Sequence, residues 1–367
     1  MRVGLYNPYL TDVLGGGERH FLTIAACLSQ KHQVEIIIPE GKTLTSVQEK
    51  KLLSQFNRTF NLDLKLINFK SGPFGSKNTW WQRLKFTRQY DIFYYMTDAS
   101  FFIPRAKKNI VHLQIPFKQK LKLSQRFKLN FWEIKTANSE FTKKWLEKHW
   151  RIRFDYLHRG SINTHSLKPA KKQNIILNVG RFTSGRAGKH CKRQDFLVKT
   201  FKKIYDQGSK DWRLVFHGPI QKGKDNQQFA SKVKHLAKGY PITFKHQSSF
   251  SQLAADYAQA KIYWHAAGYG VDEAQNPQAV EHLGLTTAEA MASGCVPVVI
   301  NKGGQPEVVT HAVNGLLWNT QKEIVDQTLE LIEKPEIWQK LSKKAIIKST
   351  QFSQERFCQL TRKIFSL

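Results

Sequence analysis

The sequence predicts an α/β protein built from two doubly wound parallel sheets, on the strength of three observations. The chain has 367 residues, which is more than one compact core usually serves. Its apolar strand segments are continuous rather than alternating, and helical patterns separate them, as in parallel sheets covered on both faces. The periodic pattern stops around residues 157–173, where Gly, Ser, Pro and Lys dominate, and then restarts. This break predicts a linker between two domains.

The first half of the chain alternates strand and helix signals. "RVGLY" and "QVEIIIP" are short apolar strands, and between them "GGGERHFLTIAACLSQ" has apolar residues at helical spacing. A later helix begins near "NSEFTKKWLEKH", with Asn138 or Ser139 as its N-cap. The other predicted strands of this half are "DLKLINF", "DIFYYM" and "NIVHLQ".

The second half repeats the alternation from "NIILNVG" to "VPVVI" and closes with three predicted helices in residues 320–367. We expect an N-terminal domain over 1–165, joined by a C-terminal helix at 352–367. The second domain is expected over 166–351.

Composition limits the class of protein. No apolar run approaches the ~20 residues that span a bilayer, and "MRVGLYNPYL" reads as a first strand rather than a signal peptide. The four cysteines lie far apart with no C-x-x-C, so neither a zinc site nor a disulfide framework is predicted. A cytoplasmic location is therefore expected.

Charge is the unusual feature of the composition. Lys and Arg number 58 against 28 Asp and Glu, a formal net charge of +30. Such a field favours polyanions, nucleic acid or anionic lipid, although a solvated basic face is an equally simple explanation. The basic segment 101–154 is also aromatic, which is typical of a membrane-surface site and of a nucleic-acid site. Its aromatic residues include Phe101, Phe102, Phe117, Phe127, Phe131, Trp132, Trp145 and Trp150, with Trp80 and Trp81 upstream.

The stretch "EHLGLTTAEAMASG" at 281–294 allows two interpretations. Thr286-x-x-Glu289 matches a capping box, in which Glu289 would only return a hydrogen bond to the helix start. Alternatively, Glu281 and Glu289 are carboxylates for ligand hydroxyls, beside helix-start amides that suit phosphate. Gly284 favours the second interpretation, because it leaves the backbone open to close approach.

Glycine-rich turns lie where a doubly wound sheet binds ligands, beyond the carboxyl ends of its strands. They are "GGGER" (15–19), "VGRF" (179–182) and "GGQPE" (303–307). None is a G-x-G-x-x-G or a Walker P-loop, and turn chemistry alone could explain each of them.

Together these motifs resemble those of glycosyltransferase family 4, the retaining GT-B enzymes. "EHLGLTTAEAMASGCVPVVINKGGQPEVV" resembles the family's E-x7-E segment, and "NVGRF…KRQDFL" resembles its G-R…K signature. "GGGERH", "NSEFTKKW" and "VNGLLW" stand where the family has similar segments. The resemblance covers nearly the whole chain and is strongest over 174–320. It implies the GT-B architecture, two Rossmann-like domains facing a central cleft.

The resemblance also implies roles for individual residues. Glu289 would bind the nucleotide ribose and Glu281 the donor sugar. Arg181 and Lys192 would neutralise the leaving diphosphate in place of a metal ion or other cofactor, with Lys189 as the alternative to Lys192. The implied donor-binding residues are completed by Gly15, Gly16, Gly17, Gly180, Gly284, Leu285 and Thr286.

One departure from the family concerns the N-terminal domain. The family often has a histidine two positions before a strand-end proline, and here Gln114 occupies that position. His112 has the same parity along the strand and would face the same side. The family's histidine contacts the donor sugar near the reacting carbon. Either His112 or Gln114 could take this catalytic role, or neither. In the C-terminal domain, His265 replaces a small residue, Leu283 replaces a phenylalanine, and the loop 267–280 is longer than in the simplest members.

The implied function is transfer of a hexose, with mannose as one candidate, from a UDP- or GDP-sugar to a glycan or lipid-linked acceptor. An anionic membrane surface would be a partner of the basic and aromatic N-terminal domain. A nucleotide-sugar epimerase or hydrolase on the same fold is the alternative. A nucleic-acid-binding protein is a third reading, but it leaves the E-x7-E and G-R…K spacing unexplained.

Overall fold

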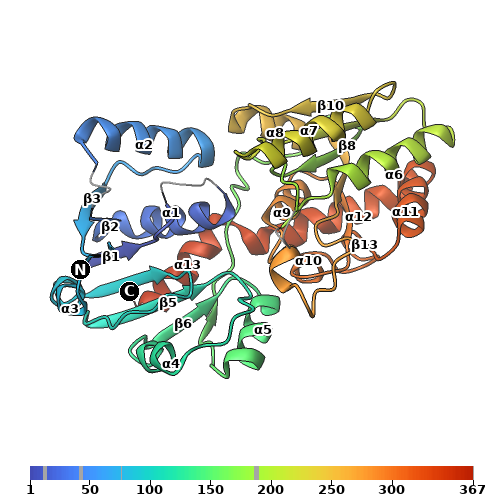
Figure 1. The fold of residues 1–367 in the computed structure, drawn as a ribbon. Coiled ribbons are helices and arrows are strands. Elements are labelled where there is room, and N and C mark those ends of the chain that lie inside the picture. Colours follow the sequence, from blue (N-terminus) through green and yellow to red (C-terminus); the bar gives the residue numbers. More distant parts are fainter. Residues whose placement is uncertain (11–14, 41–43, 76, 186–189, 367) are drawn as a thin grey trace. The chain divides into compact units, whose positions relative to one another are not determined.

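The computed structural model describes residues 1–10, 15–40, 44–75, 77–185 and 190–366. The chain divides into two compact units (Figure 1). Unit 1 comprises residues 1–161 and 354–367, and unit 2 comprises 162–353. None of the helices in the described part of the chain has the length and apolar character that crossing a bilayer requires.

Unit 1 contains a seven-stranded sheet of order β3-β2-β1-β4-β5-β6-β7, and every neighbouring pair is parallel. The predicted strand "DLKLINF" began too early, because the observed strand starts only at Ile67. The strands are β1 (Arg2–Tyr6), β2 (Gln33–Pro39), β3 (Ile67–Gly72), β4 (Ile92–Met96), β5 (Lys108–Leu113), β6 (Ile134–Ala137) and β7 (Tyr156–Leu157).

Alternate residues of these buried strands supply two cores, one on each face of the sheet. On β4, Tyr94 joins the core under the helices α1 (Gly16–Ser29), α2 (Ser46–Phe60) and α13 (Gln354–Phe365). Its neighbour Tyr95 joins the opposite core. The helices on that second face are α3 (Trp80–Thr87), α4 (Leu123–Leu129) and α5 (Glu140–Trp150). Ser139 is the N-cap of α5, as predicted, and its Oγ accepts a hydrogen bond from Thr142 N at 3.1 Å.

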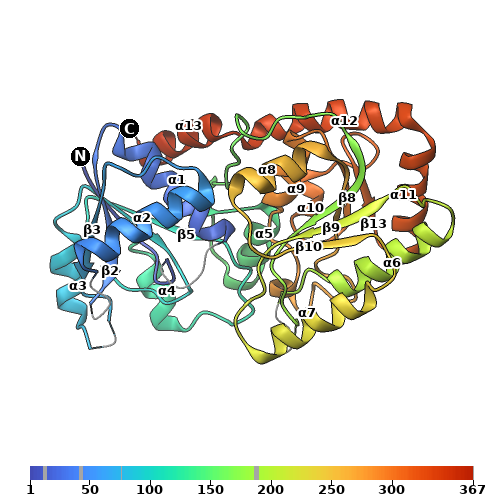
Figure 2. The same ribbon diagram turned by 90° about the horizontal axis from the view of Figure 1, so that it is seen from above.

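Unit 2 contains a six-stranded parallel sheet of order β10-β9-β8-β11-β12-β13. Figure 2 shows β8, β9 and β10 side by side. The strand order reverses direction between β8 and β11, which makes their carboxyl ends the topological switch point. The strands are β8 (Gln173–Val179), β9 (Arg213–His217), β10 (Ile242–Lys245), β11 (Ala260–His265), β12 (Val296–Ile300) and β13 (Leu316–Trp318).

Helices cover both faces of this sheet as well. One core lies under α6 (Gln194–Asp206), α7 (Lys224–Leu236) and α11 (Gln321–Glu333). The other lies under α8 (Phe250–Gln259), α9 (Leu285–Ala292) and α12 (Pro335–Ser349), beside the short helix α10 (Gln305–Val308). The prediction of three closing helices is confirmed, because α11, α12 and α13 follow one another to the end of the chain.

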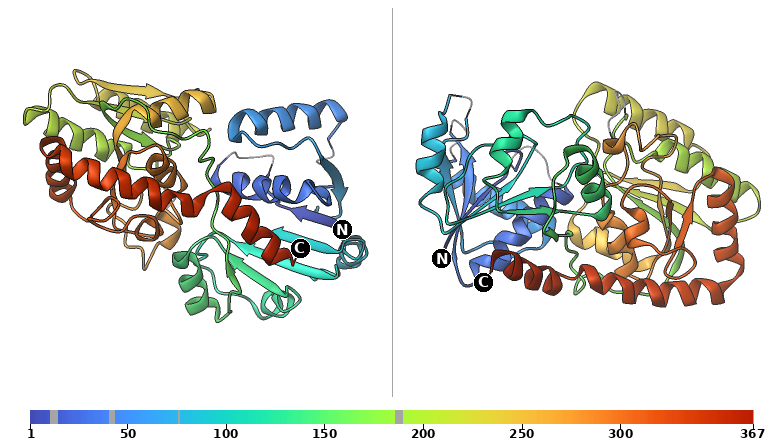
Figure 3. Two further views of the ribbon diagram at one scale, coloured as in Figure 1. Left: turned by 180° about the vertical axis from the view of Figure 1, so that it is seen from behind. Right: turned by 90° about the horizontal axis from the view of Figure 1, so that it is seen from below.

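The last helix, α13, corrects the prediction about cysteines. It packs on α1 (Figure 3), and Cys358 of α13 forms a disulfide with Cys27 of α1, at a sequence separation of 331 residues. Sequence spacing could not indicate this bond, because only the fold brings the two helices together. Cys191 and Cys295 are free and buried.

Candidate active site

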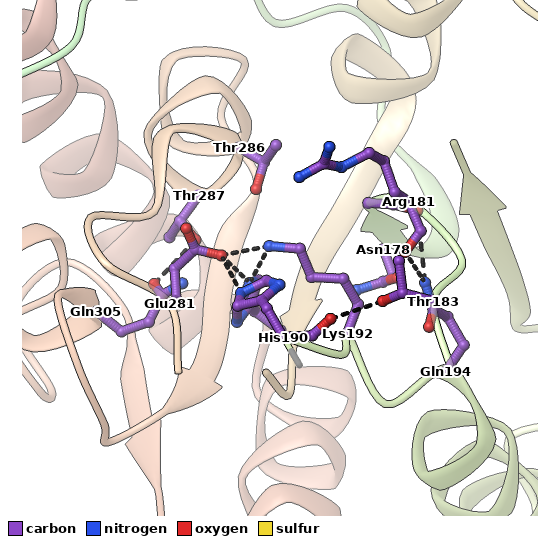
Figure 4. A network of polar contacts seen from close by, with 12 residues as sticks. Asn178, Arg181, Thr183, His190, Lys192, Gln194, Glu281, Thr286, Thr287 and Gln305 are labelled. Atoms are coloured by element: carbon purple, nitrogen blue, oxygen red, sulfur yellow. Dashed lines mark hydrogen bonds and ion pairs between the residues drawn. The ribbon is translucent and has the colours of Figure 1, made fainter. Parts of the chain in front are cut away.

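Gly180 and Lys192 lie against each other at the carboxyl end of β8. A Cβ atom added at Gly180 would lie only 2.7 Å from Lys192 Cγ and 3.1 Å from its Cδ. Glycine is therefore the residue that lets the lysine side chain cross the end of the strand. The Lys192 ammonium then contacts the Glu281 carboxylate as an ion pair (Figure 4).

The Glu281 carboxylate has two further nitrogen neighbours. His265 Nε2 lies 3.1 Å from Glu281 Oε2, and His190 Nε2 lies 3.6 Å from the same oxygen. Burial opposes ionisation, but the Lys192 charge and the bonds from both histidines hold the pKa of Glu281 well below its usual range. Glu281 is therefore a carboxylate fixed in an electropositive setting.

The helix start at Gly284 tests the capping-box interpretation of "EHLGLTTAEAMASG". Gly284 is the N-cap of α9 at φ 99°, and no side-chain capping bond forms there among the described residues. Thr286 is the second residue of the helix, and its Oγ1 accepts a hydrogen bond from Tyr263 Oη at 2.8 Å. Glu289 Oε2 accepts one from Tyr257 Oη at 3.0 Å. The capping-box interpretation is therefore wrong.

Gln305 is packed against the start of α9. A Cβ atom at Gly284 would lie 3.0 Å from the amide of Gln305, whose Oε1 accepts a hydrogen bond from Thr287 Oγ1 at 2.9 Å. Gln305 is fully buried, and its Nε2 has no partner among the residues that the structure describes. The amides at the start of α9 thus lie beside a further buried amide donor.

The glycine pair of "GGQPE" fixes the segment that carries Glu281. Gly304 N donates to the Glu281 carbonyl at 2.8 Å, and a side chain at Gly303 or Gly304 would collide with backbone of residues 281–283. These two glycines therefore serve a close approach of two backbones.

Arg181 follows Gly180, and in Figure 4 its guanidinium extends toward Thr286. Gln194 Nε2 donates to the Arg181 carbonyl at 3.3 Å, which holds the backbone beneath the side chain. Lys189, the alternative to Lys192, lies outside the described residues.

The long loop 267–280 lines a separate cavity of about 350 Å³ in unit 2. Cys191 and Arg193, the neighbours of Lys192, face this cavity, while Lys192 itself contacts Glu281. Glu273 Oε2 accepts a hydrogen bond from Gly303 N at 2.8 Å, which ties the loop to the glycine pair.

In unit 1 the glycine turn lies against Gln114. A Cβ atom added at Gly17, in the first turn of α1, would collide with the amide of Gln114. Gln114 is half-buried, its Nε2 lies 3.1 Å from Met96 Sδ, and Asn138 Nδ2 donates to its carbonyl at 3.2 Å. Gly15 is the N-cap of α1 and Gly16 its first residue, so the predicted turn stands at the carboxyl side of β1.

His112 lies elsewhere, in the core of unit 1. It is fully buried, its ring stacks on His20 at a centroid distance of 4.2 Å, and its Nδ1 lies 2.8 Å from Thr136 Oγ1. His158 completes this cluster, 4.7 Å from His20 between ring centroids. A residue with no exposed surface offers no contact to a substrate, so the geometry favours Gln114 over His112.

No group of three or more His, Cys, Asp or Glu side chains within the described ranges is arranged to hold a metal ion. In unit 1, the buried histidines His20, His112 and His158 pack ring against ring rather than converging on one point.

Two neighbours of the predicted residues were missed from sequence. His190 lies between the G-R and K motifs without a pattern of its own, and Gln305 was part of "GGQPE" but was read as turn sequence. The packing of the buried Gln305 amide against Gly284 can be recognised only from the three-dimensional structure.

Comparison with known proteins identifies the class to which this fold and site belong. Residues 162–348, just over half of the chain, match the family model of the glycosyl transferases group 1. The chain belongs to that family.

One curated relative is a GDP-Man:Man(3)GlcNAc(2)-PP-Dol alpha-1,2-mannosyltransferase of Dictyostelium discoideum, 22% identical over 241 residues. The match covers 62% of this chain and 46% of that enzyme. A sucrose-phosphate synthase of Zea mays is 37% identical over 92 residues, which are 24% of this chain and 8% of that enzyme. The chain thus spans less than half the length of the curated relatives it matches.

Solved structures agree over the whole chain. A glycosyltransferase from Rickettsia africae has a TM-score of 0.73 and 17% identity, covering 99% of this chain and 98% of that one. Anabaena HepE, solved in complex with UDP and glucose, has a TM-score of 0.72 and 17% identity, covering 100% and 99%. The predicted fold class, two doubly wound α/β units of the GT-B type, is confirmed.

Proposed function

We propose that this chain is a retaining glycosyltransferase that moves a hexose from a nucleotide diphosphate sugar to a glycan or lipid-linked acceptor. The observation that carries the proposal is the Lys192–Glu281 pair, which lies at the carboxyl ends of β8 and β11 beside the start of α9. This is the switch point where doubly wound sheets bind ligands. Family membership supports the same reaction.

Each group then has a chemical task. The amides of Gly284, Leu285 and Thr286 would bind the diphosphate, since helix starts favour anions. Arg181 and Lys192 would stabilise its charge as it leaves. Glu281 would bind sugar hydroxyls and Glu289 the ribose. No further cofactor or metal ion is required of the site.

The reaction needs no second carboxylate. The acceptor oxygen would attack the anomeric carbon on the face from which the diphosphate departs, as the bond from carbon to phosphate oxygen breaks. The acceptor proton would pass to that leaving oxygen, which acts as the general base. In unit 1, Gly15, Gly16 and Gly17 are proposed to border the donor and the acceptor, and Gln114 is proposed to contact the donor sugar.

A thermal-shift panel of UDP-, GDP- and ADP-hexoses tests the donor site. At least one donor should raise the Tm of the wild type, and Glu281→Gln and Glu289→Gln should reduce that rise. Glu333→Gln, an exposed glutamate at the end of α11, is the matched control. The proposal fails if no nucleotide sugar stabilises the wild type, or if all three variants respond alike.

Product analysis with the stabilising donor alone separates transfer from the alternative reaction. A transferase should leave most of the donor intact until an acceptor is added. Rapid conversion of donor without acceptor would instead favour an epimerase or hydrolase.

We also propose that unit 1 binds an anionic membrane surface. Most aromatic residues of segment 101–154 are core, including Trp132 and Trp150, which are fully buried. Phe127 and Leu123 of α4 remain 59% and 86% exposed, next to the exposed Lys118, Lys120 and Lys122. On α3, Trp80 and Trp81 stack on each other and are 56% and 65% exposed. Exposed apolar side chains among cations suit an interfacial site.

Vesicle co-sedimentation tests this surface. Phosphatidylglycerol vesicles should bind the protein and phosphatidylcholine vesicles should not. Leu123→Ser/Phe127→Ser should weaken binding at least tenfold. Two apolar side chains that become buried in the membrane contribute about 3 kcal/mol or more to binding. Val47→Ser, which alters an exposed valine of α2, is the control. Binding to RNA in preference to anionic vesicles would contradict the proposal.

A further inference from the structure

The carboxylate of Glu281 is held by more groups than a sugar-binding glutamate requires. Besides Lys192, it faces His265 from the end of β11 and His190 from the segment before α6. His265 is fully buried, and its Nε2 lies 3.3 Å from the Lys192 ammonium as well as 3.1 Å from Glu281. The imidazole therefore touches both members of the ion pair.

His265 Nε2 faces both Lys192 and Glu281, so a neutral ring can accept from the ammonium or donate to the carboxylate, but not both. An ammonium group can only donate hydrogen bonds. A protonated ring, with hydrogens on both nitrogens, can only donate, and it then binds Glu281 and no longer accepts from Lys192. His265 Nδ1 is buried and has no partner among the described residues, so nothing else there fixes the ring.

A diphosphate at the start of α9 would compete with Glu281 for the Lys192 ammonium. The phosphate charge would attract the lysine and weaken its pair with the glutamate. The two histidines would then lose a positive neighbour while still facing a carboxylate. The groups around them are Lys192, Glu281 and His282, whose ring lies 6.3 Å from that of His190 between centroids. Each of these electrostatic changes favours the protonated imidazole.

We infer that His265 and His190 are positioning residues that take over Glu281 from Lys192 when the donor binds, and that the pair takes up a proton in doing so. The inference rests on the proposed function. The proton comes from solvent and gives an imidazolium whose Nε2–H faces Glu281, so the carboxylate stays fixed for the sugar hydroxyls. His190, whose side chain is 28% exposed, provides the route to solvent.

Without a bound donor, Lys192 lowers the proton affinity of the His265 and His190 rings. Burial, together with the Lys192 charge, holds the pKa of His265 and of His190 below the ordinary histidine value. Moving that charge onto a phosphate removes one of the two causes. Donor binding should consequently strengthen as the pH falls from 8 toward 6.

Calorimetric titration of the full chain with UDP-glucose and GDP-mannose measures the proton directly. Titrations at pH 7 in buffers of different ionisation enthalpy give the number of protons taken up per donor bound. Both phosphates of a nucleotide sugar are diesters without a proton near neutral pH, so the donor itself contributes none. The wild type should take up between about 0.3 and 1 proton, because the two rings share one carboxylate.

Four variants separate positioning from a merely structural role. His265→Gln keeps a donor near Glu281 but cannot gain a proton, so it should bind the donor with reduced uptake. His265→Ala should in addition weaken donor binding at least tenfold. His190→Gln should lower uptake further when combined with His265→Gln. His235→Gln, an exposed histidine of α7, should match the wild type.

The outcomes are distinguishable. Tight donor binding without proton uptake overturns the inference and leaves the proposed function standing, as does uptake that persists in the His265→Gln/His190→Gln double variant. If neither nucleotide sugar binds while another in the panel does, that donor replaces them in the titration. If no nucleotide sugar binds, the proposed function and this inference fall together.

Discussion

The Lys192 ammonium pairs with the Glu281 carboxylate, 89 residues away in sequence. The lysine side chain reaches this partner by passing over Gly180. Sequence motifs had assigned these two side chains to different ends of the donor, phosphate for the lysine and sugar for the glutamate. Their contact places both ends of the proposed donor site within one unit of the protein. It also means that a change at either residue acts on the other.

Replacing Lys192 by methionine separates charge from packing. We expect Lys192→Met to lower kcat by about 10²–10³, the usual loss when one group that stabilises transition-state charge is removed. Lys199→Met, on the exposed face of α6, is the matched control and should retain full rate. Initial-rate kinetics with the stabilising donor measures both.

The same substitution should cost stability, since Glu281 is then left with histidine partners alone. Adding Glu281→Gln should restore Tm but not activity. A double variant that regains the rate would contradict the proposed role of Lys192.

Gly180→Ala tests whether the Lys192 side chain must pass close to the backbone of residue 180. The added methyl group would stand 2.7 Å from Lys192 Cγ, closer than van der Waals contact allows, so the side chain must shift away from Glu281. We expect a loss of donor-induced stabilisation and at least a tenfold fall in kcat/KM, with a change in Tm of a few degrees at most. If Gly180→Ala binds the donor with the affinity of the wild type, the position of Lys192 does not matter for donor affinity.

Much of the fold followed from local patterns. Continuous apolar segments such as those of β2 and β12 predicted buried parallel strands, because both faces of each strand are covered. The N-cap at Ser139 was predictable because capping is a contact within four residues.

Contacts between distant segments were not predictable in the same way. The capping box at Thr286 matched its template, yet the N-cap is Gly284, two residues earlier, because Gly284 adopts φ 99° against Gln305. His112 had the right strand parity for the site, but α1 brings His20 onto that side of the sheet and buries it. Both outcomes depend on packing partners far away in sequence, which periodicity does not encode.

The buried histidines of unit 1 should make the protein sensitive to acid. Burial lowers the pKa of His20 to about 3 and those of His112 and His158 well below the ordinary value. Between these values and the unfolded-state pKa of about 6.5, the unfolded chain binds more protons than the folded one. The free energy of unfolding therefore falls as the pH drops through about 6.5, by up to about 1.4 kcal/mol per pH unit for each histidine.

Urea unfolding at pH 7.5, 6.5 and 5.5 measures this slope. His20→Gln, whose amide can still reach Tyr94 Oη, should lower the number of protons taken up on unfolding by up to one and so reduce the slope. His235→Gln, at an exposed position, should leave the slope unchanged. An unchanged slope in His20→Gln would mean that this cluster is not what limits acid stability.

The disulfide between Cys27 and Cys358 should contribute several kcal/mol to stability. It closes a loop of 331 residues and holds the C-terminal helix α13 on α1. Chain-entropy reasoning gives about 6 kcal/mol for so long a loop, as an upper figure. Adding a reductant to the wild type should therefore lower the Tm, and Cys358→Ser should lower it by a similar amount without reductant.

The variant is its own control for the reductant, since Cys191 and Cys295 are unpaired and buried. Reductant should leave the Tm of Cys358→Ser unchanged. A wild type whose Tm ignores reductant, while mass spectrometry shows the bond broken, would mean that packing of Phe357 and Ile364 against the sheet core holds α13 by itself. The two measurements together thus divide the stability of this helix between its covalent bond and its apolar face.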